Sequence, residues 1–91
     1  MTVIDSFAEQ LHIKPEELIN KSLRIYLEQN LRKIESELYI RLKKYGIIDV
    51  FDLDKKLDEG DITENLTYED YFAIDNLESE REKIIKLLKD L

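Results

Sequence analysis

The sequence feature that most constrains this chain is a long stretch that contains no helix breaker. Between Pro15 and Gly46 the chain has neither glycine nor proline. Apolar residues recur there at intervals of three or four, the period of one face of an α-helix. Pro15 suits a first helical turn, and Gly46 suits the left-handed residue that follows a helix. The pattern therefore predicts a helix over residues 15–45, about 46 Å long. Its apolar stripe consists of Leu23, Leu27, Leu31, Ile34, Leu38, Leu42 and Tyr45.

A shorter helix is predicted to precede the long one, over residues 3–11. Apolar residues fall at helical spacing in this segment, and Thr2 or Asp5 can cap its first turn. The alternative is a brief strand over residues 1–4.

Two further helices are predicted after Gly46. Asp49 can cap a short helix over residues 50–59. Thr67, with Asp70 three residues later, forms a variant of the capping box and starts a final helix over residues 68–90.

Two long amphipathic helices joined by a compact connector are expected to fold back on one another, because each covers the other's apolar stripe. The expected fold is therefore all-α: one domain over residues 1–91, built as a long, antiparallel, coiled-coil-like helical hairpin. Phe51 and Leu53 are expected to close its tip. Arg81 interrupts the stripe of the last helix, where an apolar residue would be expected.

Such a hairpin leaves apolar residues of the long helix outside the main stripe. A chain of 91 residues buries only roughly 60–65% of its unfolded surface alone, and exposed apolar patches mark interfaces. We therefore expect a homodimer, or another partner, to cover this face. The residues concerned are Leu18, Ile19, Ile25, Tyr26, Tyr39 and Ile40.

Composition excludes several classes of protein. Charged residues make up 38% of the chain, and no apolar run approaches the roughly 18 residues of a membrane span. Cysteine is absent, which excludes disulfides and thiolate metal sites and fits a cytoplasmic protein. The N-terminus shows no basic region followed by an apolar one, so a signal peptide is not expected.

The inventory of reactive side chains predicts that the protein is not an enzyme. His12 is the only histidine, and no serine has a base at a recognisable spacing. The alternating Asp52, Asp54 and Asp58 lack the central glycine and final glutamate of a calcium-binding loop. We therefore expect no catalytic residue, cofactor, metal site or small-molecule substrate.

The negative charge is concentrated in one stretch. Residues 49–70 hold nine acidic and two basic side chains, which equals the net charge of −7 of the whole chain. Acidic groups around an exposed aromatic ring favour docking of a basic protein and do not favour nucleic acid. The candidate partner-binding residues are Asp52, Asp54, Asp58, Glu59, Asp61 and Tyr68.

The stretch IKPEELINKSLRIYLEQ, residues 13–29, resembles the second helix of ribbon-helix-helix proteins, including VapB-type antitoxins. The resemblance implies an intertwined dimer that inserts a two-stranded ribbon into the DNA major groove. That ribbon would have to come from residues 1–4, where Thr2 is the one polar reader, so no DNA-contact residue is carried over. The matching residues are Pro15, Glu16, Glu17, Leu18, Ile19, Leu23, Arg24, Tyr26 and Leu27.

The rest of the chain resembles small uncharacterised helical proteins that are common in archaea, some of them antitoxin halves of toxin–antitoxin pairs. The segments that carry this resemblance are KKYG (43–46), VFDLDKKLDEGDI (50–62) and TYEDYFAIDNLESEREKI (67–84).

These observations together favour a non-enzymatic protein-interaction module that is antitoxin- or adaptor-like. Its expected partners are a second copy of itself and a basic protein, for example a toxin. The alternatives are a DNA-binding regulator of ribbon-helix-helix descent and a structural homo-oligomer without an outside partner.

Overall fold

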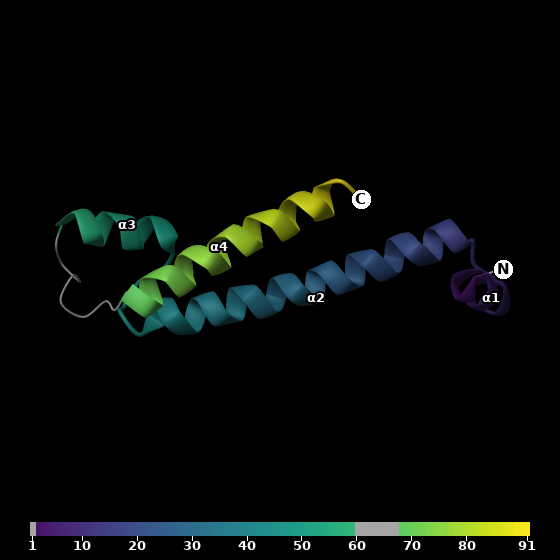
Figure 1. Cartoon of the computed structure of the whole chain (residues 1–91), viewed down its shortest axis with the longest axis horizontal. Coiled ribbons are helices and arrows are strands. Elements are labelled where there is room, and N and C mark those ends of the chain that lie inside the picture. The colour runs from purple at the N-terminus through teal and green to yellow at the C-terminus, as the bar shows by residue number, and fades with distance from the viewer. Residues whose placement is uncertain (1, 60–67) are drawn as a thin grey trace.

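All regular secondary structure in the described residues is α-helical. The computed structural model describes residues 2–59 and 68–91, and for these the all-α prediction is confirmed. The helices are α1 (Val3–Gln10), α2 (Pro15–Lys43), α3 (Val50–Glu59) and α4 (Tyr68–Lys89), as Figure 1 shows. Three of them, α1, α2 and α4, end one or two residues earlier than the sequence pattern indicated, where turn geometry replaces the regular helix.

The molecule is a rod with principal extents of 59 × 19 × 17 Å. Its radius of gyration is 19.0 Å, whereas a compact chain of this length would have about 12 Å. In Figure 1, α4 returns alongside α2 in the opposite direction, and α1 packs against the other end of α2. None of the helices in the described ranges combines the length and apolarity that a bilayer crossing requires.

The first helix begins with a reciprocal cap. The Thr2 hydroxyl accepts a hydrogen bond from the Asp5 backbone N–H at 3.2 Å, and the Asp5 carboxylate accepts one from the Thr2 backbone N–H at 3.1 Å. The Thr2 hydroxyl also donates to the Asp5 carboxylate at 2.8 Å, and this bond together with that from the Thr2 N–H lowers the pKa of Asp5. Because Val3 and Ile4 already belong to α1, the alternative of a strand over residues 1–4 is wrong for the described part of that segment.

Gly46 ends α2 in the way that the sequence indicated. Its φ of +65° lies in the left-handed region that favours glycine. The Ile47 N–H donates to the Leu42 carbonyl at 3.1 Å, and the Gly46 N–H donates to the Lys43 carbonyl at 3.1 Å. This pair of hydrogen bonds defines a Schellman motif, which is usually accompanied by an apolar contact. Here Leu42 and Ile47 are both buried in the same cluster.

His12 ends α1 as Gly46 ends α2, by adopting a left-handed backbone conformation. Its φ is +55°, and the Ile13 N–H donates to the Ala8 carbonyl at 3.0 Å. Histidine adopts this left-handed conformation more readily than most residues, although at a higher cost than glycine. The lone histidine of the chain therefore has a structural place in a turn.

The buried core is small and lies at the end of the rod where α2, α3 and α4 meet. Leu53 and Ile74 are its most deeply buried members, at 2% and 1% exposure. The burial of Leu53 confirms that this residue closes the connector. The cluster consists of Leu38, Leu42, Ile47, Leu53 and Ile74, with Ile34, Tyr45 and Leu77 packed against it.

A buried carboxylate ties the ends of α2 and α4 together. Asp70 is 6% exposed and accepts hydrogen bonds from Arg41 at 2.9 Å, from Lys44 at 3.1 Å and from the Tyr45 hydroxyl. The bonds from Tyr45 and Lys44 lower the pKa of Asp70, against the opposing effect of burial. Asp70 therefore joins two helices, in addition to its predicted place at the start of the last helix.

The other end of the rod is open. The α1 helix packs on the N-terminal end of α2 and buries Ala8 completely. Even so, Val3, Phe7 and Leu11 remain 56–69% exposed, and Leu23 of α2 is 45% exposed. The α1 helix therefore covers the end of α2 beyond α4 only in part, because an eight-residue helix is too short to cover it.

Candidate functional site

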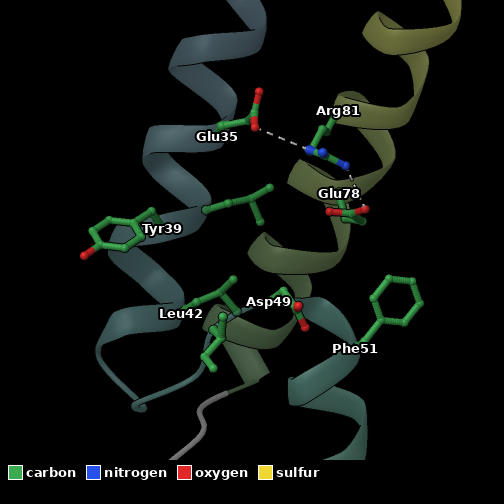
Figure 2. A pocket seen from close by; sticks show the side chains of 9 residues that line it. Glu35, Tyr39, Leu42, Asp49, Phe51, Glu78 and Arg81 are labelled. Atoms are coloured by element: carbon green, nitrogen blue, oxygen red, sulfur yellow. Dashed lines mark ion pairs between the residues drawn. The ribbon is translucent and has the colours of Figure 1, made fainter.

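One hollow of the described surface lies where α2, α4 and the start of α3 meet. It encloses about 400 Å³. We call it the apex groove, and Figure 2 shows its walls. The lining residues are Glu35, Leu38, Tyr39, Leu42, Ile48, Asp49, Phe51, Glu78 and Arg81.

The floor of the apex groove is apolar and belongs to the core. Leu38 and Leu42 of α2 form it, and both are buried. The edges are apolar too but stay in solvent, because Tyr39, Ile48 and Phe51 are 61%, 84% and 85% exposed. In Figure 2, Tyr39 projects from the side of α2 that faces away from α4, and Phe51 projects outward from α3. A ligand that reached this floor would therefore meet apolar side chains on several sides.

Charged groups bridge the groove between α2 and α4. Arg81 lies 3.8 Å (Nε–Oε2) from Glu35 across the groove and 3.7 Å (Nη1–Oε1) from Glu78 on its own helix, as the dashed lines in Figure 2 show. This explains why Arg81 interrupts the apolar stripe of α4. With Asp49 included, the lining has three acidic groups and one basic group. The rim is therefore net negative.

The prediction that Phe51 closes the tip is wrong, because this ring is 85% exposed while Leu53 is buried. They are two positions apart, and at about 100° per residue they lie on nearly opposite sides of a short helix. Only one of them can face the core. The signal was present in the sequence, since the residues three and four positions after Phe51 are the charged Asp54 and Lys55.

The outward side of α3 combines an aromatic ring with carboxylates. Phe51, Asp54 and Asp58 follow one another at helical spacing of three and four residues, and all are exposed. Glu59 is exposed beside them. We call this set the acidic–aromatic face. It borders the apex groove, because Phe51 belongs to both.

The other candidate residues fall in different places. Asp52 is half-buried, and its carboxylate accepts a hydrogen bond from the Ile48 N–H at 3.1 Å. Its own N–H donates to the Asp49 carboxylate at 2.8 Å, which caps α3 as predicted. Asp52 therefore supports the start of α3. Tyr68 is 84% exposed. Asp61 and the predicted cap Thr67 lie outside the described residues.

The apolar residues expected outside the main stripe are largely exposed. Leu18 is half-buried and Ile19 is 40% exposed, both near the end of α2 on which α1 packs. The other four range from 56% to 63% exposed, namely Ile25, Tyr26, Tyr39 and Ile40.

The described side chains form a surface suited to binding another protein and do not form a metal-binding site. Nowhere in residues 2–59 and 68–91 do three His, Cys, Asp or Glu groups gather as a metal-ligand set. What the apex does offer is an apolar floor, an exposed ring and excess carboxylates. Those features fit an amphipathic segment with apolar side chains and basic neighbours.

Comparison with known proteins gives a family. The Uncharacterized protein MJ0235 of Methanocaldococcus jannaschii is 32% identical over 74 residues, which cover 81% of this chain and 89% of that protein. No solved structure matches the chain. The predicted resemblance to an archaeal family is confirmed, while neither match bears on ribbon-helix-helix proteins or antitoxins. Because the family model matches residues 1–91, the chain belongs to the family of the Uncharacterized protein MJ0235.

Proposed function

We propose that this chain is a non-enzymatic protein-interaction module that binds a basic segment of another protein. The site is the acidic–aromatic face of α3 together with the apex groove. The module is antitoxin- or adaptor-like, since it covers a basic surface of its partner and contributes no chemistry. It acts in the cytoplasm as an antiparallel helical hairpin.

One observation carries the proposal: Phe51 is 85% exposed on a helix whose opposite side is buried through Leu53. Burying a phenylalanine side chain stabilises by about 1.5–3 kcal/mol, so an exposed ring forgoes that contribution until a partner covers it. Aromatic residues of this kind dominate protein–protein interfaces. Ile48, 84% exposed beside it, extends the apolar contact into the groove.

The surrounding charge determines which partner is favoured. Asp54, Asp58 and Glu59 are exposed around Phe51. Carboxylates at an interface rim accelerate association with a basic partner and repel an acidic one. This steering is screened by salt, because the Debye length falls from about 10 Å at 0.1 M to 3 Å at 1 M.

Competitive capture tests the proposal. The chain is immobilised and exposed to a native extract of its own source organism, and the captured proteins are quantified by mass spectrometry. The variants are Phe51→Ala and the double reversal Asp54→Lys/Asp58→Lys. Asp52 is left intact because its carboxylate supports the start of α3. The matched control reverses two exposed acids elsewhere, Glu9→Lys/Glu82→Lys.

We expect a basic protein that the wild type and the control capture equally and that salt releases. Phe51→Ala should weaken its purified complex by about 30-fold, as for an aromatic hot spot of about 2 kcal/mol. The double reversal should abolish capture at low salt. Equal capture by all four chains would refute the site, and recovery of no basic protein would refute the proposed function.

A further inference from the structure

The α2 helix carries apolar residues on two opposite sides, and only one of these sides is buried against α4. Leu38 and Leu42 face α4 and are buried. At about 100° per residue, a second set of apolar side chains lies on the other side of α2, roughly 170° away. Each of these side chains is more than half exposed. They are Ile25, Tyr26, Tyr39 and Ile40.

This second face is a palindrome. It reads Ile25-Tyr26 towards its start and Tyr39-Ile40 towards its end, so both pairs are equidistant from the midpoint between Arg32 and Lys33. A two-fold axis that runs beside α2 at the level of that midpoint, perpendicular to the helix, places Ile25 of one copy at the same height as Ile40 of the other. The same operation places Tyr26 opposite Tyr39. An interface that matches itself in this way is what a two-fold homodimer requires.

The middle of the face is polar and shallow. A hollow on α2 is lined by Arg32, Glu35, Ser36, Tyr39 and Ile40. Under the same two-fold operation, the second copy presents its residues 25–33 to this hollow, including Tyr26. The two-fold operation sets Arg32 of one copy opposite Lys33 of the other, and Glu28 and Glu37 lie about one helical turn from this basic pair on either side.

The surface area of the chain agrees with such a pairing. The chain exposes 7233 Å², whereas a compact monomer of 10.9 kDa exposes about 5,600 Å². The surplus is roughly 1,600 Å² per chain. Obligate homodimers bury about 1,000–2,500 Å² per chain, so side-by-side pairing of two rods removes a surplus of this size.

We infer that α2 forms the interface of an antiparallel, two-fold symmetric homodimer centred between Arg32 and Lys33. In it, Ile25 and Tyr26 of one copy pack against Ile40 and Tyr39 of the second copy. The inference does not depend on the proposed function, because these residues lie on a different side of the molecule from the α3 face. Glu35 and Tyr39 line both the apex groove and the hollow on the dimer face.

Sedimentation equilibrium of the full chain with a charge-swap series tests the inference. Wild type should sediment at twice 10.9 kDa. Ile25→Lys and Ile40→Glu alone should each weaken the dimer about 100-fold or more, since each acts at two symmetry-related places. The double variant Ile25→Lys/Ile40→Glu should restore the dimer, because the positive charge introduced at position 25 then faces the negative charge introduced at position 40 of the second copy. The control Ile48→Glu, at an exposed apolar site outside this face, should leave the dimer unchanged.

Each result decides one part of the inference. A monomeric wild type, or a dimer indifferent to both single substitutions, overturns the interface. Failure of the double variant to recover overturns the antiparallel register, because a parallel dimer would set like charges against each other. Circular dichroism shows whether the single variants keep their helices, and a helical monomer is the expected state for both.

Discussion

Truncation of Ile74 to alanine should destabilise the fold more than almost any other single change. Ile74 is 1% exposed and belongs to a buried cluster of five residues contributed by α2, α3, α4 and the connector after α2. Truncating a buried isoleucine to alanine costs about 2–5 kcal/mol, because transfer energy is lost and a cavity remains. A cluster this small has few other residues to compensate.

The expected loss of stability is large compared with the total free energy of unfolding. A domain of this length has a free energy of unfolding of about 5–14 kcal/mol, so Ile74→Ala removes a substantial fraction of it. At roughly 4–8 °C per kcal/mol, the melting temperature should fall by about 8 °C or more. Urea unfolding followed by circular dichroism at fixed chain concentration measures the effect, because a dimer makes stability concentration-dependent.

The matched control is Ile48→Ala, which removes apolar atoms from a side chain that is 84% exposed. Exposed substitutions usually change stability by less than 0.5 kcal/mol in either direction. Similar losses for Ile74→Ala and Ile48→Ala, or a loss below about 1 kcal/mol for Ile74→Ala, would refute the placement of the core at this end of the rod.

Three further substitutions test the turns and the buried carboxylate. Gly46→Ala should destabilise by about 1 kcal/mol in urea unfolding, because its φ of +65° is unfavourable for alanine even though nothing lies within 4 Å of the new Cβ. His12→Gly should stabilise by up to about 1 kcal/mol in the same assay, since φ is +55° there. Because the pKa of Asp70 is lowered on folding, its stabilisation is complete above the ordinary value of 3.8 and is lost as pH falls through the folded-state value. The stability gap between wild type and Asp70→Asn should therefore close in acid, and a gap independent of pH would contradict this.

The helices could be predicted because their signals are local. Pro15, Gly46 and the Thr2–Asp5 pair specify where helices start and stop through the conformations and hydrogen bonds of their own neighbours. The apolar period of α2 likewise depends only on residues three or four apart. These features can be recognised without knowing which distant residues contact each helix.

The contacts between helices could not be predicted in the same way. Asp70 looked like part of a helix start, but its partners Arg41 and Lys44 are 29 and 26 residues away in the sequence. Likewise the role of Arg81 became clear only when Glu35 of α2 lay across from it. Pairings of this kind depend on the register between α2 and α4, which helical periodicity does not determine.

Part of the candidate site was accessible from the sequence. The acidity of residues 49–70 and the exposure of Tyr68 were expected, and the chain shows Tyr68 to be 84% exposed. The exposure of Phe51 was not expected, because its size suggested core. Large apolar residues are buried on average, and only the charged residues three and four positions on indicated the opposite.

The most direct test of the proposed interaction is to map the captured basic partner onto the chain by nuclear magnetic resonance. Unlabelled partner is titrated into the ¹⁵N-labelled chain, and the shift of each backbone amide is followed. The proposed function predicts shifts concentrated in residues 48–59, lost in Phe51→Ala. Shifts centred on α1, or none at a partner concentration that saturates capture, would contradict the assignment of the α3 face as the binding site.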